Sequence, residues 1–275
     1  MRRYRYVFLV LGGCLLLSWA LVIAVDFLNV AGLRDRLTTI FWMSLFANGR
    51  PIEWVQWYTL GAMAYLSAYV GGRLISVNSD HVQGLAKFWL IMAVAFVLML
   101  VEDAGDVRHT ILRIVEQQIG SAAGRGILSK SIEFSYFAAI SMVPLYALLT
   151  YGKHVRPYAT PFRYIICGFV LYGTAAISSA TRHWWGGWYA HLGSAIEANT
   201  GLVFPEADPP ERFPQWFVDA LLEESIELLG AMFFLAAIVY IAQRLHTITL
   251  PNRTEANMKG VGNNPTHAPH PERTE

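Results

Sequence analysis

The sequence predicts an all-α polytopic membrane protein, a bundle of six transmembrane helices with an amphipathic outer segment. Of its 275 residues, 55% are hydrophobic and 15% are charged, whereas soluble domains carry about a quarter charged residues. The mean hydropathy is +0.37. Six apolar runs approach the roughly 20 residues that cross a bilayer core, and each should be a helix because lipid-facing backbone must satisfy its own hydrogen bonds. The runs are 6–25, 54–72, 88–103, 134–152, 164–181 and 225–242.

The first run follows a basic start, MRRYRY, which is a pattern shared with signal peptides. Its apolar stretch is longer than the roughly 7 to 15 residues of a signal sequence's hydrophobic region, and no clean cleavage site of small residues follows it. We therefore expect this run to stay in the protein as a membrane-crossing helix.

The chain divides into two parts, a six-helix transmembrane domain at 1–250 and a polar tail at 251–275. The tail is rich in Pro, Gly and Asn and too poor in apolar residues to fold, so we expect it to be disordered. A net charge of +1 argues against a nucleic-acid partner. The expected partner is the lipid bilayer, and membrane-protein partners or a homo-oligomer stay open.

Basic residues favour one orientation of the bundle. With six crossings both termini share a side, and the connecting segments on that side are short and basic, with Asp80 as their only acid. The opposite loops hold as many Lys and Arg residues over more than twice the length. Because dense positive charge marks cytoplasmic loops, we expect a multi-pass protein of the inner (plasma) membrane with both termini in the cytoplasm.

Acidic residues gather at the opposite, outward ends of the predicted helices, and two of these helices are short there. Between Lys87 and Glu102 lie 14 uncharged residues, a helix of about 21 Å, which is less than the roughly 30 Å hydrocarbon core. The sixth run repeats this pattern between Glu227 and Gln243. We therefore expect their carboxylates to face the bundle interior or a water-filled recess. The acids at these helix ends are Asp26, Glu53, Glu102, Asp103, Glu133, Glu223, Glu224 and Glu227.

Helical spacing groups several of these residues. Glu102, Asp106 and His109 stand at i, i+4 and i+7 and would share a helix face, unless Gly105 ends the third helix and displaces His109. In the sixth helix, Glu223 and Glu227 stand four residues apart, as neighbours on one face. Small residues that follow on that helix, such as Gly230, would permit close contact with a neighbouring helix.

Two segments outside the runs have their own patterns. Residues 107–119 place apolar side chains at helical intervals, which predicts an amphipathic helix along the membrane interface. Residues 183–216 form a long, aromatic and Pro-rich connection. This connection could cover the polar recess as a lid or serve only as a packed connector.

Three hypotheses account for the acidic residues, and no enzymatic activity is assigned. A divalent metal ion could be held by carboxylates and an imidazole, since the D-x-x-H interval at Asp106 and His109 is similar to the Glu-x-x-His pairs of dimetal helical bundles. Such an ion could serve a membrane-embedded enzyme, and His183 or His191 could add a ligand. The candidate metal ligands are Glu102, Asp103, Asp106, His109, Glu223, Glu224 and Glu227.

The second hypothesis is a proton- or cation-coupled transporter, because clustered carboxylates can share and exchange protons near neutrality. The third is a structural or assembly subunit of a membrane complex, in which Arg108, Arg113 and Arg182 neutralise the acids. The chain has no phosphate-binding Walker loop, G-x-S-x-G or H-E-x-x-H motif, which argues against the enzyme classes that use them.

The stretches VEDAGDVRH and LLEESIELLG, together with PIEW, resemble motifs of a group of uncharacterised prokaryotic multi-pass membrane proteins. That group carries an acidic D-E, a His-Glu five or six residues later and a downstream E-E-x-x-E-x-x-G. The resemblance implies that Glu102 and Asp103 stand for the acidic pair and Glu53 for a helix-opening acid. Glu223, Glu224 and Glu227 would stand for the last motif. At the His-Glu position this chain has Arg108 and His109, and the resemblance implies no activity.

Overall fold

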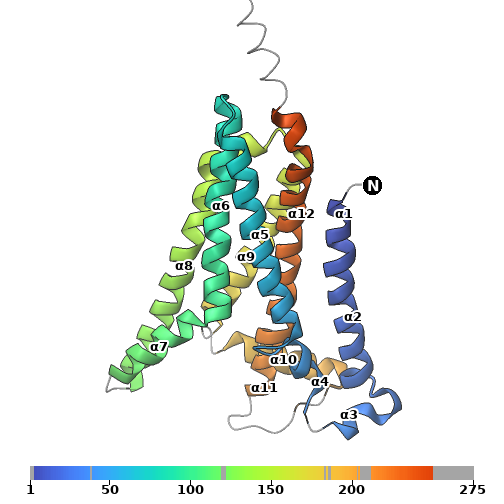
Figure 1. Cartoon of the computed structure of the whole chain (residues 1–275). Coiled ribbons are helices and arrows are strands. Elements are labelled where there is room, and N and C mark those ends of the chain that lie inside the picture. The colour runs from blue at the N-terminus through green and yellow to red at the C-terminus, as the bar shows by residue number, and fades with distance from the viewer. Residues whose placement is uncertain are drawn as a thin grey trace, which may run out of the picture.

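The computed structural model describes residues 3–37, 39–118, 122–182, 184, 187–202, 204 and 212–249, and every regular element in these ranges is a helix (Figure 1). The chain therefore has the all-α, multi-pass architecture that its hydropathy predicts. The tail predicted at 251–275 lies outside the described residues, as does His183.

Six long helical segments match the six predicted runs. Five of them are long and apolar enough to cross a membrane, and the exception is α5. Trp, Tyr and Gln residues lower the hydropathy of α5, but its 25 residues span about 37 Å and pack along α6. The six segments are Tyr4–Phe27 (α1, α2 and two π-helical turns), α5 (Pro51–Ile75), α6 (Asp80–Gly105), α8 (Ala122–Val155), α9 (Ala159–Thr181) and Arg212–Thr249 (α11, a π-helical segment and α12).

The two ends of the described chain lie at the same end of the bundle (Figure 1). Tyr4 in α1 (Tyr4–Val7) packs against Tyr240 in α12 (Glu224–Thr249), with ring centroids 5.4 Å apart. An even number of crossings places the termini in this way, as the sequence predicts.

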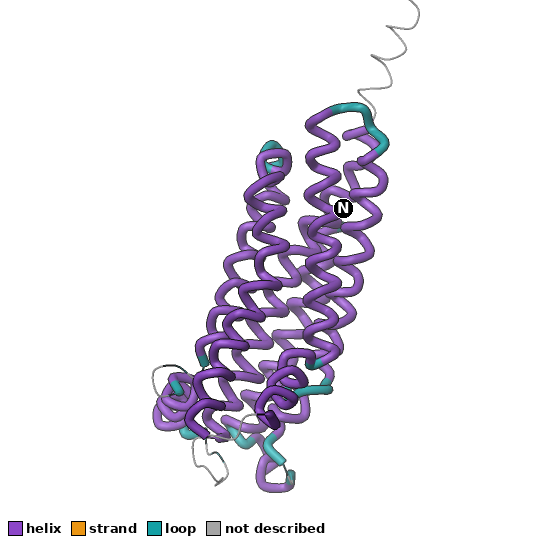
Figure 2. Tube along the Cα trace, turned by 90° about the vertical axis from the view of Figure 1, so that its left-hand side faces the viewer, coloured by secondary structure: helices purple, strands orange, loops and turns teal. Residues whose placement is uncertain are grey.

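Short helices collect at the other end, which we call the acidic end. Figure 2 shows the long helices running in a common direction, with the short ones at one extremity. The helices at the acidic end are α3 (Leu33–Arg36), α4 (Phe41–Phe46), α7 (Val107–Gln118), α10 (Trp188–Thr200) and α11 (Arg212–Trp216). The helix predicted at 107–119 is thus present as α7.

Glycines let α9 and α12 approach closely. A Cβ atom at Gly230 would lie 2.7 Å from the ring of Tyr172, and one at Gly168 would lie 2.9 Å from the ring of Phe234. Distances this short are not tolerated between carbon atoms, so larger residues would push the two helices apart. Gly230 therefore permits close contact between α9 and α12, as the sequence predicts.

Asp26 fixes the connection between the first crossing and α4. Its side chain is fully buried, and it accepts hydrogen bonds from the backbone N–H groups of Phe41 at 3.0 Å and Trp42 at 2.7 Å. These N–H groups begin α4 and have no partner within their own helix. A carboxylate at the start of a helix also interacts favourably with the helix dipole.

Candidate functional site

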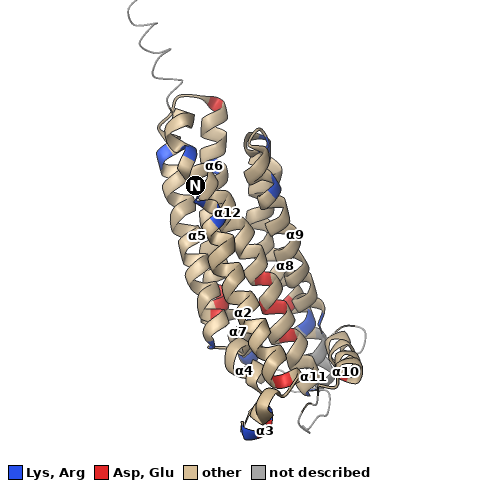
Figure 3. Ribbon diagram, turned by 90° about the vertical axis from the view of Figure 1, so that its right-hand side faces the viewer, with Lys and Arg blue, Asp and Glu red and all other residues tan. Residues whose placement is uncertain are grey.

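A cavity of about 1020 Å³ lies between α5, α6, α8, α9 and α12 and extends to the acidic end. Figure 3 shows Asp and Glu residues concentrated in this half of the bundle. All seven residues predicted as a site line the cavity, and the expectation that the third and sixth runs direct acids inward is correct. The lining acids are Glu53, Glu102, Asp103, Asp106, Asp219, Glu223, Glu224 and Glu227.

The α6 and α12 regions supply most of these carboxylates. Glu102 and Asp103 lie in the last turn of α6, whereas Glu223 and Glu224 lie at the junction of the π-helical segment and α12. This junction is inside a continuous helical segment, Arg212–Thr249. The α12 acids are therefore within a long helix, so they reach the interior without the helix being short.

The third crossing ends where the sequence allows a break. Helix α6 stops at Gly105, and Asp106 adopts a left-handed conformation with a φ angle of +47°. The i, i+4, i+7 stripe that includes His109 is therefore interrupted. His109 still lines the cavity, but it contacts Asp106 and the guanidinium of Arg182 at 3.2 Å.

The hydrogen bonds of His109 use both of its ring nitrogens. Because a guanidinium can only donate hydrogen bonds, Nε2 of His109 accepts from Arg182, and Nδ1 donates to Asp106. In this arrangement neither nitrogen is free to bind a metal ion. Because helix α6 ends at Gly105, the imidazole of His109 leaves the predicted stripe and joins the ion pairs of Asp106 and Arg182.

One region of the cavity has compensated charges, and we call it the paired region. Arg182 contacts Glu133 at 3.0 Å and Asp219 at 3.0 Å. Glu133 and Arg182 are 2% and 7% exposed, so this is a buried pair. Burial alone would lower the pKa of Arg182, but Asp219 and Glu133 raise it above its ordinary value. Arg182 therefore stays positively charged.

Arg108 compensates a third acid in the paired region, Glu102. Its Nε lies 3.8 Å from Glu102, and its Nη1 donates to Ser179 Oγ at 3.1 Å. The guanidinium also lies 4.7 Å from the ring centroid of Phe137, a favourable cation–π contact. Asp106 has Arg113 at 3.8 Å near the surface. The predicted neutralising role of these arginines is therefore present for part of the acids.

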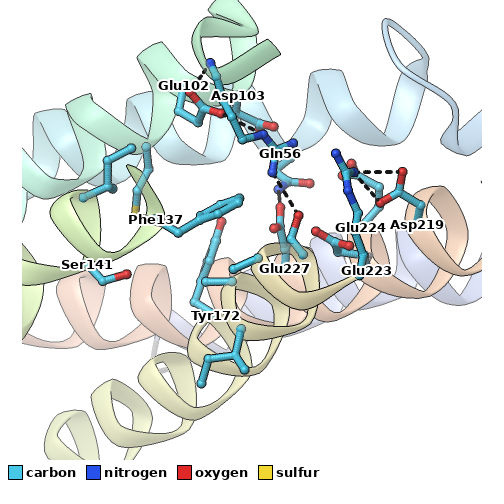
Figure 4. A pocket seen from close by; sticks show the side chains of 18 of the residues that line it. Gln56, Glu102, Asp103, Phe137, Ser141, Tyr172, Asp219, Glu223, Glu224 and Glu227 are labelled. Carbon is cyan, nitrogen blue, oxygen red and sulfur yellow. Dashed lines mark hydrogen bonds and ion pairs between the residues drawn. The ribbon is translucent and has the colours of Figure 1, made fainter. Parts of the chain in front are cut away.

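The other acids form the unpaired region, defined as Glu53, Asp103, Glu223, Glu224 and Glu227. Within the described part of the chain, none of these five carboxylates lies in an ion pair with a Lys, Arg or His side chain. Glu227 and Asp103 lie within electrostatic range of one another and of Glu224. Figure 4 shows Asp103 of α6 and Glu227 of α12 on either side of Gln56 of α5, with Glu223 and Glu224 beside them.

Neutral donors bind some oxygens of the unpaired region. Tyr189 donates to Glu223 at 2.6 Å, Gln56 Nε2 donates to Glu227, and the backbone N–H of Gly49 donates to Glu53. Burial, together with Glu223, raises the pKa of Tyr189, so its phenol keeps its proton. Among the described residues no donor reaches the buried Oε2 of Glu224 or the buried Oε1 of Gln56.

Sequence reasoning missed several residues that shape the cavity. Tyr189 is 1% exposed and donates a hydrogen bond to Glu223, which lines the cavity. Gln56, Tyr172 and Asp219 carried no motif. In the described part of the connection at 183–216, α10 packs on α11 and the π-helical segment.

The donor groups do not form a metal site of a recognisable kind. Among the described residues, no three His, Cys, Asp or Glu side chains are arranged to hold one metal ion. His191, proposed as a further ligand, is exposed and does not line the cavity. Glu102 and Glu227 line the same cavity. The metal ion stays a prediction.

No known protein family, curated protein or solved structure matches this chain. The resemblance of its acidic motifs to the prokaryotic membrane-protein group therefore stays a prediction, and the site must be interpreted from its own geometry.

Proposed function

We propose that this integral membrane protein binds a cation in the acidic cavity and carries it across the membrane in exchange for protons. The observation that supports the proposal most is the imbalance of charge. Eight carboxylates and two guanidinium groups line the cavity, and among the described residues none of the five carboxylates of the unpaired region lies in an ion pair with either guanidinium.

An unpaired charge removed from water is strongly destabilising. The unpaired region therefore requires either protons on some of its carboxylates or a cation from outside. A cation that binds there takes over the compensating role, and protons leave. Exchange of this kind couples the movement of a cation to a proton gradient.

The orientation of the protein is part of the proposal. Dense basic residues in the segments near both termini favour the cytoplasm for that end, and the inner (plasma) membrane is the expected location. The acidic end would then face outward, and a cation would reach the cavity from the outer side.

Binding of a small primary ammonium tests the first half of the proposal. Methylammonium is titrated into the detergent-purified protein and into two variants, Glu224→Gln in the cavity and Asp80→Asn, an exposed acid outside it. We expect affinity to fall about tenfold in Glu224→Gln, as loss of one charged contact implies, and to be unchanged in Asp80→Asn.

Equal binding in all three proteins would contradict the proposal. A variant Glu224→Gln that binds normally but accumulates poorly would instead favour the structural or assembly-subunit alternative. Metal analysis of the same wild-type preparation tests the divalent-ion hypothesis directly.

Flux measurements test the second half. Proteoliposomes that contain a pH dye receive putrescine, a small diamine, on one side, and internal pH is followed with time. We expect a pH change that depends on the wild-type protein and is smaller for Glu224→Gln. A pH trace identical to that of protein-free vesicles would contradict transport but leave binding intact.

A further inference from the structure

The cavity has an apolar arm beyond the acids. Helices α6, α8, α9 and α12 line it with side chains that carry no charge, and Figure 4 shows Phe137, Tyr172 and Ser141 lying on the side of the cavity away from Glu223 and Glu224. A volume of about 1020 Å³ is at the upper end for sites of drug-sized ligands. Residues of the apolar arm include Met92, Phe96, Met99, Ile140, Ser141, Pro144, Leu145, Phe169, Gly173, Ile177 and Phe234.

The lining of the apolar arm includes residues of α8 and α9 that reach the molecular surface. Phe134, Leu145 and Ile177 all line the cavity, yet they are 50%, 45% and 68% exposed. These residues belong to two helices that meet at their connection and diverge toward the acidic end (Figure 1). Because both helices are membrane crossings, this surface faces the hydrocarbon region. A ligand with an apolar chain can reach the cavity directly from the lipid.

Two buried acceptors in the polar part of the cavity have no hydrogen-bond donor among the described residues. Gln56 is 1% exposed, and its Nε2 is used by Glu227, which leaves Oε1 as an acceptor with no donor among the described residues. Glu224 Oε2 is also a buried acceptor with no donor among the described residues. Buried acceptors without donors are costly. A protonated primary amine supplies three N–H donors and the positive charge that the unpaired region lacks.

We propose that the ligand of the cavity is a single-chain, long-chain primary amine, with its ammonium group at Gln56, Glu224 and Glu227 and its alkyl chain in the apolar arm. This inference rests on the proposed cation binding and adds the chemical class of the cation. It also assigns the route of access, from the lipid between α8 and α9.

Head-group chemistry is tested with two probes that share one chain. Dodecylammonium and dodecyltrimethylammonium partition similarly into detergent, but the second has no N–H donors. We expect the trimethyl compound to bind at least about tenfold more weakly, because hydrogen bonds to charged groups are lost. Equal binding of the two compounds would overturn the assignment of a primary ammonium.

The position of the chain is tested with a matched pair of glycine variants. A Cβ atom at Gly173 meets nothing within 4 Å, and Gly173 lines the cavity. A Cβ atom at Gly72 also meets nothing, but Gly72 is exposed on α5 and outside the cavity. Gly173→Trp should fill part of the apolar arm and weaken dodecylammonium binding about tenfold or more, on the scale of overpacking costs. Gly72→Trp should bind as the wild type does.

Crosslinking of the wild type gives a second measurement that needs no variant. A dodecylammonium analogue with a diazirine in its chain should label peptides of α8 and α9, and unlabelled dodecylammonium should compete. Labels only on α1 and α2, or labels insensitive to competition, would overturn the inference.

Methylammonium separates the two proposals. Suppose that the wild type binds methylammonium, but the wild type and Gly173→Trp bind dodecylammonium with equal affinity. This result would overturn the apolar-arm assignment and leave cation binding intact. Wild-type protein that binds neither amine would overturn both.

Discussion

The paired and unpaired regions border one cavity and both contain carboxylates, but only the paired region supplies arginines that compensate them. In the paired region, Arg182 contacts Glu133 and Asp219 at 3.0 Å each. In the unpaired region, Glu224 and Glu227 contact only neutral groups or none among the described residues. From this difference we infer that the first region maintains the fold, and we propose that the second binds the cation.

The largest expected effect comes from breaking the paired region. Arg182→Leu leaves the buried Glu133 without its cation, and we expect a loss of about 3–5 kcal/mol in the free energy of unfolding. Thermal unfolding in detergent, followed by tryptophan fluorescence, measures the change. The double variant Arg182→Leu with Glu133→Gln should recover part of the loss. A single variant as stable as the wild type would remove the distinction between the two regions.

The next effect concerns Asp26, an acid that is buried but fully bonded. Asp26→Ala removes hydrogen bonds to the backbone of Phe41 and Trp42, which should cost about 1–3 kcal/mol of unfolding free energy. Asp35→Ala is the control, because Asp35 is exposed and its ion pair with Arg34 measures 3.8 Å; such pairs contribute about 1 kcal/mol or less. Equal losses in both variants would contradict the assigned role of Asp26.

Tyr189→Phe should have a smaller effect. The substitution removes the donor to Glu223 at 2.6 Å and keeps the ring packing, so we expect a loss of about 0.5–1.5 kcal/mol. The same unfolding assay measures it. A loss as large as that of Arg182→Leu would indicate that Glu223 is a structural acid and belongs with the paired region.

The smallest expected change in stability is that of Glu224→Gln. Its Oε2 has no donor among the described residues, and a neutral amide removes an unpaired charge, so stability should stay within about 0.5 kcal/mol or rise. The free energy of unfolding and the methylammonium affinity of Glu224→Gln are measured on the same preparation. Weaker binding with unchanged stability would identify Glu224 as a binding residue. A destabilisation above about 2 kcal/mol would instead place Glu224 among residues that maintain the fold.

The sequence predicted the architecture and the general location of the acidic cavity because those properties are local. Apolar runs define the helices, and acids inside or beside them mark the polar cavity, so all seven predicted residues line it. The break at Gly105 was visible as an alternative. The sequence does not predict which acids pair with an arginine, because Arg182 contacts Glu133 and Asp219 across 49 and 37 residues of sequence.

For the same physical reason, Tyr189 and Gln56 were not predicted. Tyr189 and Gln56 become site residues only because α10 packs on the π-helical segment and α5 packs on α12. Their sequence context shows an aromatic cluster and an apolar helix, respectively. The acids of the third and sixth runs face inward as expected, but the premise that these helices are short is wrong, because the helical segments Asp80–Gly105 and Arg212–Thr249 have 26 and 38 residues.

Proton release on cation binding tests the central claim most directly. The heat of methylammonium binding to the purified wild type is measured in two buffers that differ in their enthalpy of ionisation. If protons compensate the unpaired region until a cation replaces them, the two heats will differ, and the difference will disappear in the double variant Glu224→Gln with Glu227→Gln. Identical heats in both buffers, or proton release that persists in the double variant, would contradict the account.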